Sequence, residues 1–413
     1  MDIISNSCQT IKSCRISNSK DLVKVLDLGI QPLANSLKKK SNDQEDRYPL
    51  TLSFSSESCL LQLNETIKKE KLFDSYVWVT STSSIAKKYA ETFYKNVTQN
   101  ISLDKNKDLI IEIASNDGTF LKPFIKNGHK KVLGIDPAKN ICEIANKSNV
   151  KTLNEYWNKE LANKLLKQQG SAKLVFARNV IPHVSELDSV VSGIEKILDD
   201  NGAGIFEIHD ANVIFDQLHY DSVYHEHLCY FTLKSITYLL NKFNLFPFEV
   251  NKSPISGGSF VIYFSKKKIS KSKNYEIAVI QEEQSKVNEL NSWKNFAEKV
   301  NNHKNEIKKI FSHFNGKRII GFGSSARSQT FLNYCNFNEK NIELIIDNNP
   351  LKQNFFSPGS NIKIVDFAEG ISVEPEVIFI LAWNFKSEII DQCKLAGFKG
   401  EYIIPFPNKP EVI

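Results

Sequence analysis

The chain has 413 residues, of which 41% are apolar, and its net charge of +6 is spread over many lysines rather than gathered in one tract. These values indicate two or three globular domains and argue against a nucleic-acid-binding protein, because no basic helix or RNA-binding signature is present. The first residues are polar, the longest purely apolar run covers only residues 377–383, and the seven cysteines are scattered. No signal peptide, membrane span or membrane partner is expected, and a reduced, cytoplasmic location is predicted.

Residues 1–80 contain short, turn-rich elements that are expected to form a small N-terminal domain. A strand runs into a turn at residues 25–35, and residues 50–54 and 60–63 have the alternation of a hairpin.

Residues 81–268 alternate apolar strands with helices, which predicts an α/β domain with a parallel, doubly wound sheet. The expected strands cover residues 108–113, 131–136, 173–177 and 204–208, and a helix is expected from Thr119 onward.

Residues 269–413 are expected to form a second α/β domain. One or two long helices in residues 272–314 would bridge the domains, and buried strands are predicted at 318–323, 343–347 and 377–381.

The first candidate site is the turn that follows the strand at 108–113. Residues 112–118 read Glu-Ile-Ala-Ser-Asn-Asp-Gly, and Asp136 ends the next strand. A dinucleotide or an adenosine ligand binds at this edge of such a sheet, and the second acid then accepts hydrogen bonds from ribose hydroxyls. An α/β turn without any ligand is the alternative. The candidate cofactor-binding residues are Glu112, Ala114, Asn116, Asp117, Gly118, Asp136 and, after the strand at 173–177, Asn179.

His183 lies in the run Ala-Arg-Asn-Val-Ile-Pro-His at residues 177–183, just after a predicted strand. Because ligands bind at the carboxyl edge of the sheet, this histidine is a candidate site residue. A single histidine after proline can equally be structural.

Residues 224–227 read Tyr-His-Glu-His and hold two of the eight histidines in the chain. Proton abstraction from carbon needs a base, a group that orients it and a donor for the developing oxyanion, and this cluster supplies all three residue types. A polar surface turn is the alternative. Tyr224, Glu226 and His227 are therefore candidate catalytic residues.

A second glycine turn occupies residues 321–326, with Asp347 after the next strand. Its Gly-x-Gly-x-x-Ala spacing fits a nicotinamide-cofactor fingerprint, but it could equally bind sugar-nucleotide phosphates or serve only the fold.

Cys14 and Cys59 lie 45 residues apart, where a structural zinc site would need a Cys-x-x-Cys pair at each end. Ser17 stands three residues after Cys14 and Ser56 three residues before Cys59, so each pair has lost one thiolate. Cys8 is one replacement within reach in the sequence, and a bound zinc is doubtful.

In this order, these motifs resemble the sugar-nucleotide C-methyltransferases, which make branched deoxysugars. The similarity includes residues 26–35 and 48–50 in the N-terminal part, and residues 112–118, 177–184 and 224–227 in the centre. In the C-terminal part it includes residues 321–327, 347–350 and 381–385.

The resemblance implies a central Rossmann-like class I methyltransferase domain, a degenerate zinc-binding-like N-terminal domain and a C-terminal Rossmann-like domain. It implies S-adenosylmethionine as cofactor and a nucleotide-linked 4-keto sugar as the partner substrate, methylated at C3. The residue roles that it implies are His227 as base, with Glu226, Tyr224 and His183 beside it and Tyr76 reaching the sugar. Ala114 departs from the glycine that is usual in the first turn.

Two other classes of protein stay open at this point. One is a nicotinamide-dependent oxidoreductase that uses residues 321–326 and Asp347, and the other is a sugar-nucleotide-binding protein that has lost activity. The oligomeric state is expected to be a monomer or a homodimer.

Overall fold

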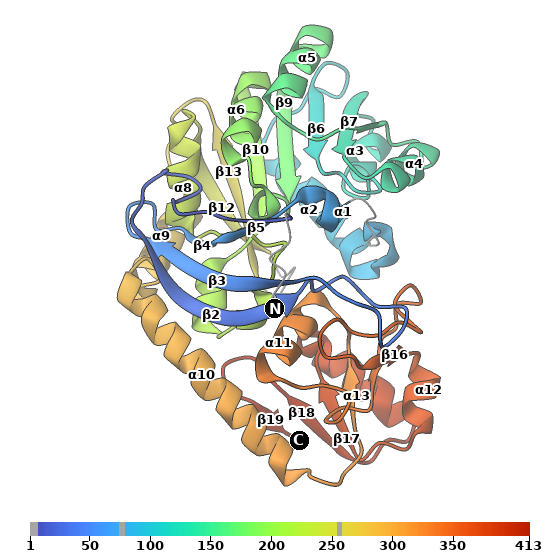
Figure 1. The fold of residues 1–413 in the computed structure, drawn as a ribbon. Coiled ribbons are helices and arrows are strands. Elements are labelled where there is room, and N and C mark those ends of the chain that lie inside the picture. The colour runs from blue at the N-terminus through green and yellow to red at the C-terminus, as the bar shows by residue number, and fades with distance from the viewer. Residues whose placement is uncertain (1–6, 74–78, 254–257) are drawn as a thin grey trace.

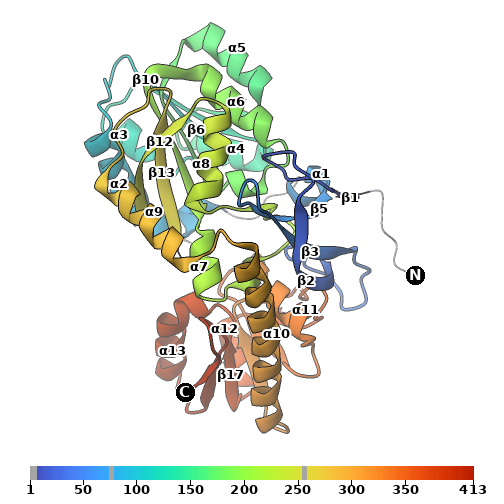
Figure 2. The same cartoon turned by 90° about the vertical axis from the view of Figure 1, so that its left-hand side faces the viewer.

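The computed structural model describes residues 7–73, 79–253 and 258–413. In Figure 1 a central α/β unit lies above a C-terminal α/β unit, and the N-terminal strands lie between the two. Helix α10 (Leu290–His313) runs along the side of the molecule and packs on strand β2 (Leu22–Pro32), as Figure 2 shows from the side.

The N-terminal strands form two small antiparallel sheets. They are β1 (Cys8–Thr10), β2, β3 (Arg47–Ser55), β4 (Leu61–Leu63) and β5 (Glu65–Ile67), with α1 (Lys69–Phe73) after them. The predicted hairpin is confirmed, since β3 pairs with β4 so that Leu52 lies opposite Leu63. The larger sheet has the order β11-β4-β3-β2, and β11 (Cys229–Tyr230) comes from the central unit. The N-terminal domain and the central unit therefore share a sheet.

The central unit contains a seven-stranded sheet with the order β12-β13-β10-β9-β6-β7-β8. Its strands are β6 (Leu109–Ile113), β7 (Lys131–Asp136), β8 (Thr152–Asn154), β9 (Ala172–Arg178), β10 (Leu198–His209), β12 (Phe246–Ser253) and β13 (Ser259–Ser265). The strands from β8 to β10 are parallel, and β13 is antiparallel to β10. The four predicted strands are all present. The strand order reverses between β6 and β9, which is where open α/β sheets bind ligands.

Helices cover both faces of this sheet. Their bounds are α2 (Ser84–Asn100), α3 (Lys122–Lys126), α4 (Lys139–Lys147), α5 (Lys159–Gln169), α6 (Leu187–Ile197), α7 (Ala211–Asp216), α8 (Leu233–Lys242) and α9 (Lys273–Ser285). Ile110 and Phe176 face one core with α2, α3 and α4, whereas Ile111 and Val175 face the other with α5 and α6. This burial on both faces explains why the strands read as continuous apolar runs rather than as alternating ones.

The helix predicted from Thr119 begins three residues later, at Lys122 in α3. The side chain of Asp117 accepts hydrogen bonds from the backbone and hydroxyl of Thr119, and Pro123 favours the first turn of a helix. The turn after β6 is therefore longer than the sequence pattern indicates.

The C-terminal unit contains a six-stranded sheet with the order β16-β15-β14-β17-β18-β19. Its elements are β14 (Ile319–Phe322), α11 (Ala326–Cys335), β15 (Leu344–Ile346), β16 (Lys363–Val365), α12 (Phe367–Ser372), β17 (Val377–Ile380), α13 (Lys386–Leu395), β18 (Glu401–Ile404) and β19 (Glu411–Val412). The three strands predicted here are present, and the predicted bridging helices are α9 and α10.

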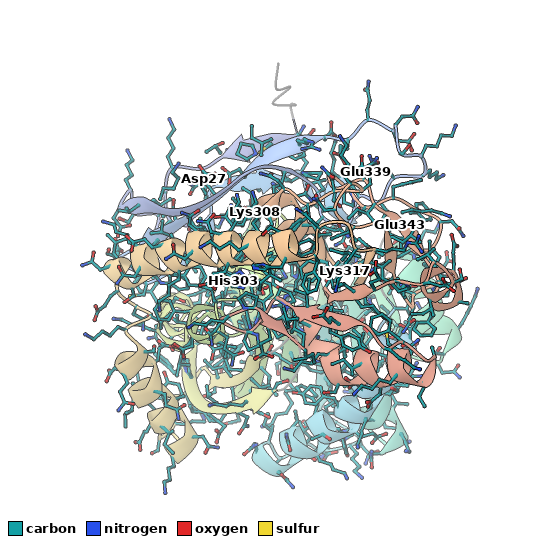
Figure 3. All side chains as sticks on the ribbon, turned by 90° about the horizontal axis from the view of Figure 1, so that it is seen from below. Asp27, His303, Lys308, Lys317, Glu339 and Glu343 are labelled. Carbon is teal, nitrogen blue, oxygen red and sulfur yellow. The ribbon has the colours of Figure 1, made fainter. Side chains whose placement is uncertain are left out.

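The three parts pack as one body, because one apolar core runs through all of them. His303 on α10 is buried at this junction. Its Nε2 donates to the carbonyl of Pro405 at 2.7 Å, and its Nδ1 accepts from the hydroxyl of Tyr220 at 3.0 Å. Figure 3 shows His303 on α10, with Asp27 on the N-terminal strands and Lys317 at the entry to the C-terminal unit.

None of the helices in the described ranges combines the length and the apolar character that crossing a lipid bilayer requires.

Candidate active site

The turn after β6 has an unusual backbone. Ala114, Asn116 and Gly118 all have positive φ angles, of 52°, 51° and 75°. A Cβ atom on Gly118 would lie 2.5 Å from a methyl carbon of Val150, so a glycine is required there. Ala114 stands where the resembling family usually has glycine, and it adopts a backbone conformation that glycine adopts with less strain.

Asp136 at the end of β7 holds this turn. Its Oδ2 accepts from the backbone N–H of Asn116 and its Oδ1 from that of Ala138, both at 2.9 Å. Burial raises the pKa of Asp136 against the effect of these two hydrogen bonds. The carboxylate therefore lies at the carboxyl edge of the sheet, directly against the turn.

The side chains of Asn116 and Asp117 bind the segment that leads into α2. Asn116 Oδ1 accepts from the backbone N–H of Thr80 at 2.9 Å, and Asp117 Oδ2 accepts from that of Ser81 at 3.2 Å. The two residues predicted to bind cofactor thus hold the short helix η1 (Thr80–Thr82) over the turn.

Glu112 is the last residue but one of β6 and is 2% exposed. Its Oε2 is buried and has no hydrogen-bond partner among the described residues. Burial raises the pKa of this carboxyl well above its usual value, and the carboxylates of Asp117, Asp136 and Glu207 act in the same direction. A buried carboxyl group that is left without a donor is a position where a ligand donor fits.

Asn179 follows β9 with a φ of 52°, and its backbone N–H donates to the carbonyl of Glu207. This geometry turns the chain away from the sheet and into the short helix η2 (Ile181–His183). Asn179 and His183 therefore both lie at the carboxyl edge, as predicted.

The loop at residues 224–227 fixes which ring nitrogen of His227 carries the proton. Nδ1 of His227 donates to the carbonyl of Ser222 at 3.1 Å, and a carbonyl can only accept. In the neutral imidazole Nε2 then carries the lone pair, and it accepts from the hydroxyl of Tyr224 at 2.7 Å. The ring of His183 packs edge-on against that of His227, with 4.8 Å between the ring centroids.

Both of these histidines are neutral near pH 7. Burial, together with the neighbouring His183 and His209, lowers the pKa of His227 well below its ordinary value. Burial also lowers the pKa of His183 to about 4. An imidazole that stays neutral keeps its lone pair available as a base.

Glu226 and His225 connect this loop to the N-terminal domain. Asn35 Nδ2 donates to Glu226 Oε1 at 2.6 Å, and burial raises the pKa of Glu226 to about 7. His225 Nε2 donates to the carbonyl of Pro49 at 3.1 Å. His225 and Glu226 therefore both connect the N-terminal domain to the loop that carries the candidate base.

The C-terminal unit reaches the same region through Asp221, which sequence reasoning missed. Arg327 donates two hydrogen bonds to this buried carboxylate, at 3.0 and 2.8 Å, and Trp383 Nε1 donates a third at 2.9 Å. Burial alone would raise the pKa of Asp221, but Arg327 holds it below the usual range. Arg327 and Trp383 lie in the C-terminal motifs at 321–327 and 381–385, which is the signal that could have found them.

Tyr76, the predicted sugar-contacting tyrosine, lies outside the described residues.

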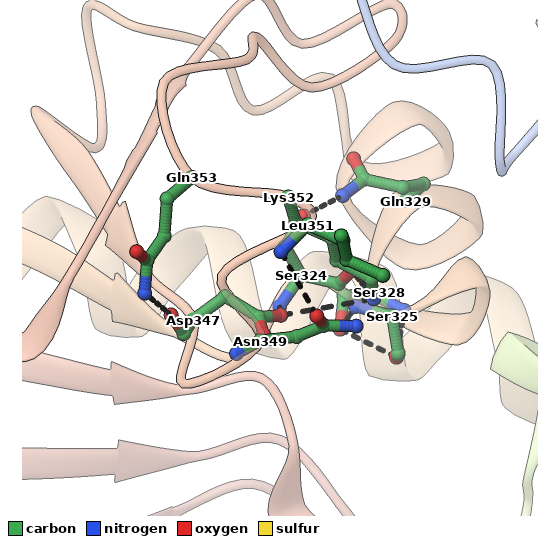
Figure 4. A network of polar contacts seen from close by, with 9 residues as sticks. All are labelled: Ser324, Ser325, Ser328, Gln329, Asp347, Asn349, Leu351, Lys352 and Gln353. Carbon is green, nitrogen blue, oxygen red and sulfur yellow. Dashed lines mark hydrogen bonds and ion pairs between the residues drawn. The ribbon is translucent and has the colours of Figure 1, made fainter. Parts of the chain in front are cut away.

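The glycine turn of the C-terminal unit is filled by a side chain of its own domain. Lys352 Nζ donates to the carbonyl of Ser324 at 2.7 Å and lies 3.7 Å from the carboxylate of Asp347 (Figure 4). Ser325 and Ser328 cap each other at the start of α11. The fingerprint seen in the sequence thus forms a polar network within its own unit, although the buried Oε1 of Gln329 has no hydrogen-bond partner among the described residues.

The donor set of the N-terminal domain does not fit a structural zinc ion. Cys14 Sγ lies 3.1 Å from the hydroxyl of Ser58, and Ser17 accepts a hydrogen bond from the backbone of Ser19. The described residues contain no group of three or more His, Cys, Asp and Glu side chains arranged to hold a metal ion.

Family models match three successive parts of the chain. "Putative zinc binding domain" matches residues 14–73, "Methyltransferase domain" residues 86–248 and "C-methyltransferase C-terminal domain" residues 254–407. The chain is 27% identical to C-methyltransferase NovU of Streptomyces niveus, over 98% of this chain and 97% of that protein.

Two solved structures resemble about half of this chain weakly. A protein of Pyrococcus horikoshii OT3 is 15% identical, with a TM-score of 0.36 over 48% of this chain and 98% of that chain. Magnesium protoporphyrin IX methyltransferase of Synechocystis PCC 6803 is 10% identical, with a TM-score of 0.35 over 48% of this chain and 92% of that chain. At these TM-scores neither likeness carries an argument.

The sequence models and the relative agree with the fold over nearly the whole chain. The central unit is the Rossmann-like methyltransferase domain that the sequence predicted, and the nicotinamide alternative is not needed. The chain is similar to C-methyltransferases over nearly its whole length, and it is an S-adenosylmethionine-dependent methyltransferase.

Proposed function

We propose that the enzyme methylates C3 of a 4-keto-deoxysugar carried by a nucleoside diphosphate. The observation that supports this proposal most directly is the state of His227. Its Nδ1 is committed to the carbonyl of Ser222, and its Nε2 carries a lone pair that faces the hydroxyl of Tyr224. A C-methyltransferase needs such a base only where the carbon to be methylated bears an acidic hydrogen, as a carbon beside a ketone does.

In the proposed reaction the C4 ketone acidifies the hydrogen on C3. Nε2 of His227 takes this proton, and the electron pair of the C–H bond moves onto the ketone oxygen. We assign Tyr224 and His183 as the donors that stabilise the oxyanion. Tyr224 must then turn its hydroxyl from His227 to the sugar, which exposes the lone pair of the base. The electron pair returns to form the new bond from C3 to the methyl carbon, and His227 ends the step protonated.

The remaining residues bind and orient the two substrates. We assign Glu226, held by Asn35, to a sugar hydroxyl, and Tyr76 to the sugar by resemblance. Holding two substrates in a reactive geometry supplies a large part of the rate of such reactions.

S-adenosylmethionine supplies the methyl group as an electrophilic sulfonium and leaves as a neutral thioether. The residues that we assign to hold it fit its groups. The unpartnered carboxyl of Glu112 suits its ammonium, and Asp136 suits its ribose hydroxyls. The backbone of the turn at 114–118 and Asn179 would line the space between them.

The test is hydrogen exchange at C3. The enzyme is incubated in D₂O with S-adenosylhomocysteine and a panel of thymidine, guanosine and cytidine diphosphate 4-keto-deoxysugars, and the C3 proton is followed by NMR. We expect one of these compounds to lose that proton, and the same compound with S-adenosylmethionine to gain a methyl group on C3. A methyl group found on oxygen, or methylation at a carbon other than C3, would overturn the proposal.

A further inference from the structure

Arg178, at the end of β9, is a buried cation that the proposed chemistry does not use. Its side chain is 10% exposed, and Nε donates to Glu207 Oε2 at 2.6 Å. Glu207 is fully buried, and its other oxygen accepts from the hydroxyl of Ser253 at 2.6 Å. The Nε side of the guanidinium is therefore held by a carboxylate whose two oxygens both accept hydrogen bonds.

Aromatic rings from α2 and from the turn before α3 surround the guanidinium. Its central carbon lies 3.1 Å from the ring centre of Phe120, with Tyr89 and Phe93 at 5.5 and 5.7 Å. With Phe120 against its central carbon and Glu207 at its Nε, the guanidinium has its outer edge left to contact a ligand. The two terminal nitrogens on that edge have no acceptor among the described residues.

The charges around Glu112 show what such a ligand must carry. Asp117, Asp136 and Glu207 act on Glu112 as carboxylates, and Arg178 acts on it as a cation. Arg178 and Glu112 are near enough to influence each other, yet they form no ion pair. A ligand that contacts both side chains would therefore need an acidic group for Arg178 and a basic group for Glu112.

The methionine part of S-adenosylmethionine has this distribution of charge. It carries one carboxylate together with an ammonium and a sulfonium, and the two cations suit the acidic side chains. A planar guanidinium binds a carboxylate through two parallel hydrogen bonds, which a lysine cannot reproduce.

We propose that Arg178 binds the carboxylate of the methionine part of the cofactor and so selects a ligand with an intact amino-acid group. This inference rests on the cofactor of the enzyme and not on the proposed sugar. Sequence reasoning selected Asn179 and His183 in the run at 177–183. The inference adds Arg178 of the same run, with the cofactor carboxylate as its binding partner.

The test compares two ligands by calorimetric titration of the full-length enzyme. One is S-adenosylhomocysteine, and the other is the same molecule without its carboxyl group. We expect the Arg178→Lys variant to bind S-adenosylhomocysteine roughly tenfold to a hundredfold more weakly, because it loses a charged, two-point contact. Its affinity for the decarboxylated ligand should stay within about twofold of that of the wild type.

A second variant protects the test against misfolding. Removing Arg178 alone would leave Glu207 buried without a counter-charge, so Arg178→Gln is combined with Glu207→Gln. An equal loss for both ligands in the two variants, or no loss for either, would overturn the role of Arg178. Failure of the wild type to bind S-adenosylhomocysteine would instead refute the cofactor assignment, and the two failures are distinguishable.

Discussion

The two α/β units of this enzyme build the same turn and use it differently. In the central unit Asp136 accepts from the backbone of Asn116 and Ala138, and in the C-terminal unit Asp347 accepts from that of Ser324 and Asn349. These four hydrogen bonds are between 2.8 and 2.9 Å long. The acid at the end of the second strand therefore first serves to shape the turn, whether or not a ligand is bound.

The difference lies in what faces each turn. In the C-terminal unit the ammonium of Lys352 lies against Ser324 and Asp347, so a cation of the same unit faces the acid of that turn. In the central unit the carboxyl of Glu112 stays buried without a hydrogen-bond partner among the described residues. A shared fingerprint thus indicates a shared backbone, whereas a buried carboxyl that no described cation of the same unit pairs makes the central turn the candidate for ligand binding.

The comparison makes the central unit the candidate for the chemistry. Replacing the proposed base, His227, should have the largest effect on turnover. His227→Asn should lower the turnover number by roughly a hundredfold to ten-thousandfold, which is the usual contribution of a general base. Affinity for S-adenosylhomocysteine should stay unchanged. Methylation rates with a substrate from the exchange experiment, and calorimetry, measure the two effects.

Lys352→Met in the other turn is the matched control, and its turnover should remain within about twofold of the wild type. Near-normal turnover in the His227 variant would show that another group removes the proton.

The contact between the two units should carry the largest effect on stability. Asp221→Asn leaves Arg327 without a counter-charge at a buried junction, and we expect the free energy of unfolding to fall by about 3 kcal/mol. Lys317→Met removes an exposed ion pair with Glu401 and should cost less than about 1 kcal/mol. Chemical denaturation of both variants measures the difference, and equal losses would mean that the buried pair adds nothing beyond an exposed one.

The residue after the first strand differs between the two turns, and exchanging it should have opposite effects. A Cβ atom on Gly323 would lie 2.3 Å from that of Ala382, and its φ is 100°, so Gly323→Ala should destabilise by about 2 kcal/mol. Ala114 already has a positive φ, so Ala114→Gly should stabilise by about 0.5–1 kcal/mol. Thermal unfolding measures both, and a stabilising Gly323→Ala would show that the two turns are not equivalent.

A pH-dependent effect concerns Glu226, whose pKa is raised to about 7 by burial. The folded enzyme then holds a proton that the unfolded chain has already lost between about pH 4.5 and 7, so this group lowers stability as the pH rises through that window. Glu226→Gln does not titrate, and its Tm should rise relative to the wild type by a few degrees between pH 5 and 8. A difference in Tm that stays constant with pH would show that this carboxyl does not titrate there.

Much of the fold could be predicted because its signals are local. The apolar strands at 108–113, 131–136 and 377–381 have no other stable location than a sheet covered on both faces. The start of α3 could not be predicted from periodicity, since Asp117 binds Thr119 and delays the helix. The roles assigned to His227, Glu226, Tyr224 and His183 stay predictions, as does that of Tyr76.

The sequence by itself determined which elements and motifs the enzyme has, namely a doubly wound sheet, two glycine turns and a Tyr-His-Glu-His run. Only the tertiary structure decided which of them meet. Asn35 reaches Glu226 across 191 residues, and Arg327 reaches Asp221 across 106. The physical reason is that periodicity and turn chemistry act between neighbours along the chain, whereas burial and charge pairing depend on distances that exist only after the three parts have packed together.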